Sequence, residues 1–146
     1  MPERTAVAHW DGDLRTGAGR VELSSGAFKG AYSYNSRFEN GAGTNPEELI
    51  AAAHAACFSM ATSGGLTKAG FKPVRINTTA RVHLESIAGG FKVQRIDLDM
   101  DAEVPGIDEA AFSAIAQAAK AGCPISQALA AVPEIVLHAR LRQTTA

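Results

Sequence analysis

The feature that most constrains this chain is a long apolar stretch placed directly after a strong helix start. Leu49–Ala61 contains no Asp, Glu, Lys or Arg, and it follows Thr44-Asn45-Pro46-Glu47-Glu48. A capping residue, a proline in the first turn and two early acids are typical of a helix N-terminus. Gly70 can end the helix after Lys68, which gives about 24 residues and about 36 Å. Since the helix lacks a polar stripe, we expect it to be buried on most sides.

Size, composition and charge narrow the class of protein. The 146 residues are 46% hydrophobic and 20% charged, which predicts a single domain spanning residues 1–146 with a real core. A formal net charge of -1 argues against a nucleic-acid partner bound through a strongly basic surface. The apolar run is too short to span a bilayer, and the first ten residues lack the pattern of a signal peptide. We expect a cytoplasmic protein without a membrane partner.

The remaining segments predict an α+β protein with mainly antiparallel pairing. Turn residues separate three short β segments near the N-terminus, and alternation marks a later hairpin with one core-facing side. The expected strands are Thr5–Trp10, Arg20–Leu23, Ala31–Phe38, Val74–Ser86, Phe91–Val104 and Glu134–Leu141. The expected helices after the first are Glu109–Ala121 and a short turn over Ile125–Ala130.

Two cysteines, Cys57 and Cys123, are the first candidates for chemistry. They do not form a CxxC motif, so a thioredoxin-like redox centre and a zinc ribbon are both disfavoured. In a reducing cytosol a structural disulfide is not expected, and two buried thiols that fill the core are the simplest interpretation. Burial alone would raise the pKa of Cys57 and make it inert, so reactivity requires a fixed positive charge nearby. Arg37, in the strand before the helix, is the best candidate, although it can equally be a solvated surface arginine.

The surroundings of Cys123 act in opposite directions. It follows Gly122 and therefore lies near the carbonyl end of one helix, which disfavours a thiolate. It also precedes Pro124 and can cap the next helix, which favours a thiolate. The sequence does not indicate which of these two effects is stronger, nor which of the two cysteines reacts first.

Acidic and histidine side chains leave further alternatives. Glu47 and Glu48 can serve only as first-turn acids that complement the helix dipole. His54 lies three residues before Cys57, so a Cys–His hydrolase is conceivable, although a polar group packed in a core helix is the better interpretation. The other histidines, on three separate strands, show no metal-ligand spacing. We expect no metal site.

Four segments of the sequence resemble the OsmC/Ohr family, in its OsmC branch of hydroperoxide peroxidases. The resemblance extends over almost the whole chain, and the two cysteine motifs occur in the order and spacing of the family. The segments are Tyr34-Asn35-Ser36-Arg37-Phe38, Gly43-Thr44-Asn45-Pro46-Glu47-Glu48-Leu49, His54-Ala55-Ala56-Cys57-Phe58-Ser59-Met60 and Lys120-Ala121-Gly122-Cys123-Pro124-Ile125-Ser126-Gln127.

The resemblance implies an OsmC-like fold, with mainly antiparallel sheets around a long buried helix, in an intertwined homodimer. It implies a thiol-dependent peroxidase that reduces organic hydroperoxides and hydrogen peroxide in oxidative or osmotic stress defence. Cys57 matches the peroxidatic thiol and Cys123 the resolving thiol, while Arg37 matches the activating arginine and Glu47 the acid that holds it. An external thiol or dithiol would be the reductant, and no cofactor is implied.

Helix geometry bears on the homodimer independently of the family. Ten residues separate Glu47 from Cys57, which corresponds to about 15 Å along one helix. A glutamate side chain cannot close that distance, so a Glu47 that serves Cys57 most simply comes from a second copy of the chain. The alternative is a monomer in which Arg37 alone reaches Cys57.

Two other functions stay open at the level of sequence. One is a redox-sensing or ligand-binding dimer in which the cysteine pair changes state but turns over slowly. The other is the Cys–His hydrolase that uses Cys57 and His54.

Overall fold

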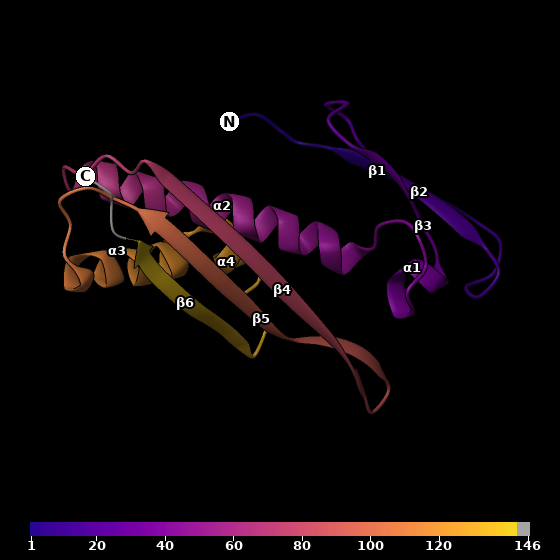
Figure 1. Cartoon of the computed structure of the whole chain (residues 1–146). Helices are drawn as coiled ribbons and strands as arrows, with labels where there is room; N and C mark the ends of the chain where they lie inside the picture. Colours follow the sequence, from indigo (N-terminus) through magenta and orange to yellow (C-terminus); the bar gives the residue numbers. More distant parts are fainter. Residues whose placement is uncertain (143–146) are drawn as a thin grey trace. The chain divides into compact units, whose positions relative to one another are not determined.

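The computed structural model describes residues 1–142, which form two compact units, Met1–Leu49 and a second unit from Ile50 onward (Figure 1). The boundary falls inside a helix that is continuous across it. Each unit is described by itself below, and the single domain expected over residues 1–146 stays a prediction.

The first unit contains an antiparallel three-stranded sheet and a short helix. Its strands are β1 (Ala6–Asp11), β2 (Ala18–Leu23) and β3 (Lys29–Tyr32), in that order across the sheet. The helix is α1 (Tyr34–Phe38). The first two strands agree with the prediction to within about two residues.

The predicted strand Ala31–Phe38 is correct only for Ala31 and Tyr32, which lie in β3, and is wrong from Tyr34 onward, where Arg37 lies on α1. The Ser33 side chain accepts a hydrogen bond from the Ser36 amide at 3.1 Å, and the Ser36 hydroxyl oxygen accepts one from the Ser33 amide at 2.8 Å. This reciprocal pair is a capping box, which satisfies two amides that a helix start leaves without partners. The pairing of two serines three residues apart ends β3 and begins α1.

The first unit buries almost nothing. Gly19, Ser36 and Thr44 are its buried residues, whereas Val7 and Leu14 are 64% and 63% exposed. No large hydrophobic side chain in residues 1–49 is buried. A three-stranded sheet without a covered apolar face is marginal by itself in water, so this sheet requires another surface to cover it.

The long helix α2 (Pro46–Lys68) has the predicted bounds. The Asn45 side chain accepts a hydrogen bond from the Glu48 amide at 2.8 Å, as a helix N-cap does. At the other end Gly70 takes a φ of 92°, in the left-handed region that favours glycine, and the helix stops there.

The expectation that α2 is buried on most sides is wrong for the single chain. Its buried residues are His54, Phe58, Thr62 and Leu66, a single stripe spaced every four residues, while Met60 is 77% exposed. By length and composition α2 could also cross a membrane, unlike the shorter run considered above. The packing of its stripe into the core of the second unit is instead that of a core helix.

The second unit is a three-stranded sheet with two helices besides α2 (Figure 1). A long antiparallel hairpin, β4 (Arg75–Ile87) and β5 (Gly90–Glu103), matches the prediction to within one residue. Strand β6 (Glu134–Arg142) lies parallel to β5, so the pairing is mainly but not entirely antiparallel. Helices α3 (Glu109–Gly122) and α4 (Pro124–Ala128) lie between β5 and β6 in the sequence.

Alternation along β5 builds the core. Every second residue from Ile96 of β5 to Val104, just after the strand, points inward and is buried. Two apolar residues of α2 and three of α3 are also buried. Together these buried residues are Ile96, Leu98, Met100, Ala102, Val104, Phe58, Leu66, Phe112, Ala116 and Ala119. The core-facing side predicted for the hairpin is confirmed. The core also includes residues of α2, which carries Cys57, and of α3, which ends just before Cys123.

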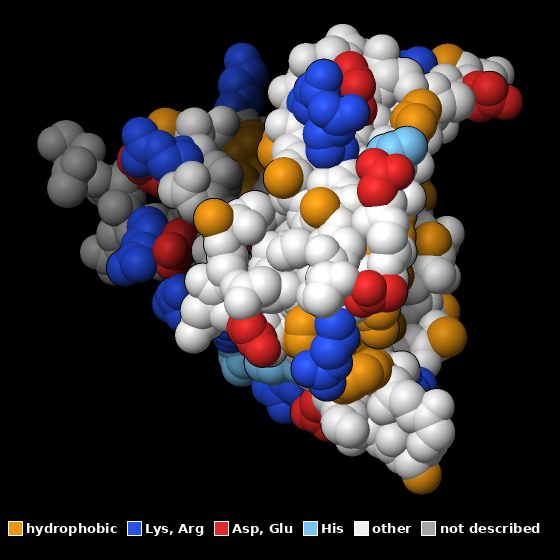
Figure 2. All heavy atoms as spheres, turned by 90° about the vertical axis from the view of Figure 1, so that its right-hand side faces the viewer, with side chains coloured by type: hydrophobic (Ala, Val, Ile, Leu, Met, Phe, Trp, Pro, Cys, Tyr) orange, Lys and Arg blue, Asp and Glu red, His pale blue; other side chains and the backbone are white. Residues whose placement is uncertain are grey.

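Charged side chains are largely paired with each other on the strands of the second unit. Asp97, almost buried on β5, accepts hydrogen bonds from Arg95 and His83, each at 2.7 Å. The bond from Arg95 is the main cause that lowers the pKa of Asp97 to about 2. Among the described side chains on the face drawn in Figure 2, blue and red groups alternate and no large patch of one sign forms.

Truncation of Phe112 tests the core. Phe112 is 1% exposed, so Phe112→Ala removes a packed ring and is expected to lower the free energy of unfolding by about 3–5 kcal/mol. Val74→Ala, at a side chain that is 59% exposed, should change it by less than about 0.5 kcal/mol. Urea unfolding followed by circular dichroism measures both, and equal losses in the two variants would contradict this core.

Candidate active site

The two cysteine sulfurs, 66 residues apart in the sequence, are in direct contact. Cys57 lies on α2, and Cys123 lies between α3 and α4. Both are free thiols, and the Cys123 thiol donates a hydrogen bond to the Cys57 sulfur at 2.8 Å. A pair at this distance needs little movement to form a disulfide.

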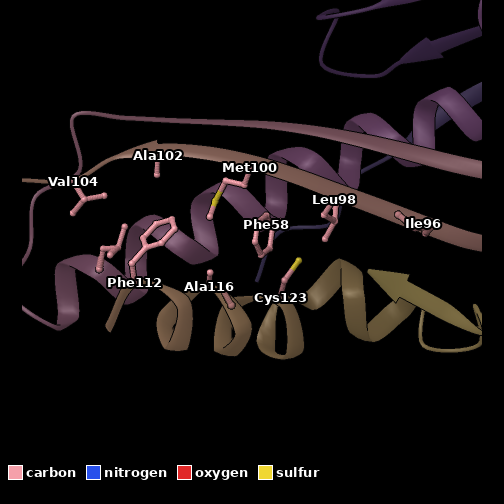
Figure 3. Close-up of a cluster of buried hydrophobic side chains, with 11 residues drawn as sticks. Phe58, Ile96, Leu98, Met100, Ala102, Val104, Phe112, Ala116 and Cys123 are labelled. Carbon is pink, nitrogen blue, oxygen red and sulfur yellow. The ribbon is translucent and has the colours of Figure 1, made fainter. Parts of the chain in front are cut away.

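The two thiols differ in exposure. Cys123 is fully buried, and Figure 3 shows it in the core cluster near Phe58 and Leu98. Cys57 is only partly buried. A reagent from solution therefore meets the Cys57 sulfur before it meets the Cys123 sulfur.

The two thiols also differ in acidity. Burial, and next the hydrogen bond with Cys123, raise the pKa of Cys57. Burial also acts to raise the pKa of Cys123, but the contact with Cys57 and the polar groups of Ser126 and Ile125 outweigh it, and the pKa is lowered. The groups at the start of α4 thus favour the Cys123 thiolate. Among the described residues, no cationic side chain is one of the groups that shift the pKa of Cys57.

His54 is directed at a serine and not at Cys57. Its Nε2 lies 2.7 Å from the Ser126 hydroxyl oxygen, and its Nδ1 is buried without a hydrogen-bond partner. Burial lowers the pKa of His54, so the ring is neutral near pH 7. Since neither ring nitrogen bonds the Cys57 sulfur, the arrangement argues against a Cys–His hydrolase. Sequence reasoning gave Ser126 no role, although its place three residues after Cys123 is a usable signal.

Arg37 and Glu47 form a close ion pair in the first unit. The Arg37 Nε donates to Glu47 Oε1 and Oε2 at 3.1 and 3.2 Å, and Nη2 donates to Oε1 at 2.7 Å. The side chain of Glu47 is only 12% exposed. A two-pronged contact of this kind fixes the plane of the guanidinium. Arg37 is therefore not a freely solvated arginine, and Glu47 does more than complement a helix dipole.

A network of short polar contacts holds this pair in place. The Ser36 hydroxyl donates to the Thr44 carbonyl at 2.7 Å, and the Asn45 side-chain amide donates to the Ser36 carbonyl at 3.1 Å. These bonds tie α1, which carries Arg37, to the first turn of α2, which carries Glu47. The Thr44 hydroxyl donates to Glu48 at 2.9 Å, so the two adjacent acids have different partners.

Arg37 also lines an aromatic pocket of about 250 Å³ in the first unit. Trp10 and Tyr32 pack with ring centroids 5.4 Å apart, and Tyr34 and Phe38 with centroids 4.8 Å apart. Gly19 permits this, because a Cβ there would lie 2.6 Å from the Tyr32 ring. Trp10 was not among the candidate residues from the sequence; it pairs with Gly19 across β1 and β2, and the nearby aromatic residues were the available signal.

Within residues 1–142, no group of three or more His, Cys, Asp or Glu side chains is arranged to hold a metal ion. His83 bonds Asp97, and His9 bonds Asp11 at 2.9 Å.

Comparison with known proteins identifies similar chains. The family model described as OsmC-like protein matches residues 39–138. Peroxiredoxin OsmC of Escherichia coli (strain K12) is 52% identical over 136 residues, covering 92% of this chain and 94% of that protein. The organic hydroperoxide resistance protein of Xanthomonas axonopodis pv. citri (strain 306) is 35% identical over 89 residues, covering 60% of this chain and 61% of that protein. The crystal structure of the organic hydroperoxide resistance protein OhrB of Bacillus subtilis has a TM-score of 0.67 at 24% identity, covering 94% of this chain and 98% of that chain.

Mild oxidation tests the contact between the two sulfurs. Diamide, a thiol oxidant, is expected to join Cys57 and Cys123 within one chain, because their sulfurs lie 2.8 Å apart. Intact mass should fall by two hydrogens, and both thiols should disappear from titration together. Cys57→Ser should block the change. Disulfides formed mainly between chains, seen on a non-reducing gel, would contradict this geometry.

Proposed function

The chain belongs to the OsmC family, and on that premise we propose that it is a thiol-dependent peroxidase that reduces organic hydroperoxides and hydrogen peroxide. The observation that carries the proposal is the contact between Cys57 and Cys123, two free thiols brought together from distant parts of the chain. The names of its relatives, a peroxiredoxin and an organic hydroperoxide resistance protein, agree with this chemistry.

Cys57 is the thiol that reacts with peroxide. Its partial exposure supports this role, since Cys123 is fully buried. The Cys57 thiolate attacks one peroxide oxygen, the O–O bond breaks, and the alkoxide leaves and takes up a proton to become an alcohol. The sulfur is oxidised by two electrons to a sulfenic acid, and the peroxide is reduced.

Cys123 then resolves the sulfenic acid. Its sulfur attacks the Cys57 sulfur, an S–S bond forms, and the hydroxyl group leaves as water with the proton that Cys123 releases. Two electrons from an external thiol or dithiol reduce the disulfide and restore both thiols. The lowered pKa of Cys123 suits a group that must attack as a thiolate.

Arg37 supplies the positive charge that Cys57 lacks within its own unit. A guanidinium near the Cys57 sulfur would lower its pKa and stabilise the alkoxide as it leaves. Glu47 is a positioning residue, because its two-pronged contact with Nε and Nη2 fixes the orientation of the guanidinium. The near-burial of Glu47 supports a maintained contact.

Each site is completed by a second copy of the chain, in a homodimer. Glu47 and Cys57 lie ten residues apart on one unbroken helix, hence about 15 Å along its axis, so the Arg37–Glu47 pair of the same chain is poorly placed to serve Cys57. Exposed apolar residues on α2, and the coreless sheet of residues 1–49, need a covering surface. A partner of the same sequence provides one, and residues 1–146 then act as one functional domain.

The aromatic pocket beside Arg37 supports a preference for organic hydroperoxides. Its apolar lining can take the organic group while the guanidinium faces the polar peroxide end. We assign the chain to peroxide defence under oxidative or osmotic stress, in the cytoplasm, where reducing conditions keep both thiols free.

Removal of each thiol tests the two steps separately. Cys57→Ser is expected to abolish consumption of cumene hydroperoxide, because no nucleophile remains. Cys123→Ser is expected to consume about one equivalent per chain and then stop, with Cys57 held as a sulfenic acid. A coupled peroxidase assay and mass spectrometry measure both. Repeated turnover by Cys123→Ser would overturn its role as the resolving thiol, and a harmless loss of Cys123 is what a hydrolase predicts.

Subunit mixing tests the shared site. Arg37→Ala is expected to slow Cys57 oxidation by about 10²-fold, the scale for loss of one charge-stabilising donor. When Cys57→Ser and Arg37→Ala chains are refolded together, one site of each heterodimer regains both native residues and activity returns. Light scattering should give about twice the 15.2 kDa mass of one chain. A monomer at micromolar concentration, or an inactive mixture after proven exchange, would contradict the shared site.

A further inference from the structure

A buried polar pair lies directly behind the cysteine pair and has no part in the steps above. His54 is 0% exposed and Ser126 is 7% exposed, and the ring nitrogen Nε2 lies 2.7 Å from the serine oxygen. The two residues are 72 positions apart in the sequence. Burial of a histidine ring with one nitrogen unpartnered costs free energy, so the stability of the core does not account for His54.

The protonation of this pair can be assigned from its contacts. The ring is neutral, since burial lowers its pKa, so one nitrogen carries the hydrogen. We place it on Nε2, because a buried N–H without an acceptor is rarer than a buried acceptor without a donor. His54 Nε2–H then donates to the Ser126 oxygen, and the serine hydrogen is free to point elsewhere.

The serine hydrogen has one nearby acceptor that matters for chemistry. Cys123 is the N-cap of α4, and Ser126 is the third helical residue after it. The Gln127 amide donates to the Cys123 carbonyl at 3.0 Å, which confirms that the turn is closed. Side chains at the N-cap and at the third helical position face each other. In the dithiol the Cys123 side chain makes no capping hydrogen bond and donates to Cys57 instead.

We propose that His54 and Ser126 are positioning residues for the resolving sulfur: the Ser126 hydroxyl donates to the Cys123 thiolate, and His54 Nε2–H holds that hydroxyl in the donating rotamer. This inference rests on the proposed function of Cys123. In the resolving step the Cys123 proton passes to the departing hydroxyl of oxidised Cys57, which leaves as water. The sulfur that attacks is then a buried anion, and the serine hydroxyl stabilises it until the S–S bond forms. The contribution of Ser126 to the lowered pKa of Cys123 agrees with this.

The first test isolates Cys123 as the only thiol, in a Cys57→Ser background. Thiolate ultraviolet absorbance followed against pH gives its pKa without any peroxide chemistry. Ser126→Ala is expected to raise that pKa by about one unit, the equivalent of one hydrogen bond. His54→Leu should raise it in the same direction and fold normally, because it removes an unpartnered buried nitrogen. Ser126→Thr keeps the hydroxyl and should keep the pKa, as should His54→Gln, which keeps an N–H donor.

The second test follows a single turnover with Cys57 present. After one equivalent of cumene hydroperoxide, Ser126→Ala should form sulfenic acid at the normal rate but close the disulfide about tenfold more slowly. Thr62→Val is the matched control. Thr62 is also fully buried on α2, and its hydroxyl donates to the Phe58 carbonyl at 2.9 Å. Thr62→Val should change neither the pKa nor the rate of disulfide closure.

The outcomes separate this inference from the function on which it rests. If Ser126→Ala and His54→Leu behave like Thr62→Val in both tests, the positioning role is overturned while the peroxidase stands. If Ser126→Thr fails to restore the pKa of Cys123, the effect is one of packing and the inference is overturned. Repeated turnover by Cys123→Ser would instead overturn the proposed role of Cys123 as the resolving thiol, and the titration of Cys123 would be unaffected by that result. Because His54 and Ser126 are substituted in separate variants, the inference stays testable if one of these variants does not fold.

Discussion

The packing of one stripe of α2 against β5 and α3 sets the position of every group in the second unit that carries chemistry. His54 and Phe58 enter the core from this stripe, and Cys57, just before Phe58, is left at the margin of the stripe and partly exposed. The end of α3 brings the buried Cys123 into contact with Cys57. The sulfur contact thus follows from helix packing, and no covalent bond or metal is needed to hold it.

The surroundings of the two thiols shift their acidities in opposite directions. Burial and a neighbouring thiol both disfavour ionisation of Cys57, whereas the start of α4 and Ser126 favour ionisation of Cys123. A peroxidase that used the second unit alone would therefore activate the less accessible sulfur. Under the proposed function, the guanidinium of Arg37, held by Glu47, reverses that order. The homodimer proposed above would also cover the apolar surface that a single chain leaves exposed.

Elements with strong local signals could be predicted from the sequence. The start of α2 at Pro46, its end before Gly70, the long hairpin and the start of α3 at Glu109 all lie close to where the pattern puts them. Alternation predicted the inward face of β5 correctly. The prediction of a strand over Ala31–Phe38 was wrong from Tyr34 onward, because the capping box formed by two serines three residues apart outweighs the β-propensity of the aromatic residues. The prediction that α2 is buried on most sides was also wrong for the single chain. The composition of a helix indicates that it needs to be covered, but not whether the same chain or another one covers it.

The sequence by itself determined the residue types and their local setting: two isolated cysteines, one at the start of a short helix, an arginine near an acid, and a family resemblance that assigned them roles. Tertiary structure alone decided that the two sulfurs touch, that His54 faces Ser126 instead of Cys57, and that Glu47 grips Arg37 with both oxygens. The physical reason is the distance along the sequence over which each kind of interaction acts. Caps, turns and periodicity act over a few residues and are written locally, whereas contacts between residues 66 or 72 positions apart depend on how whole helices pack.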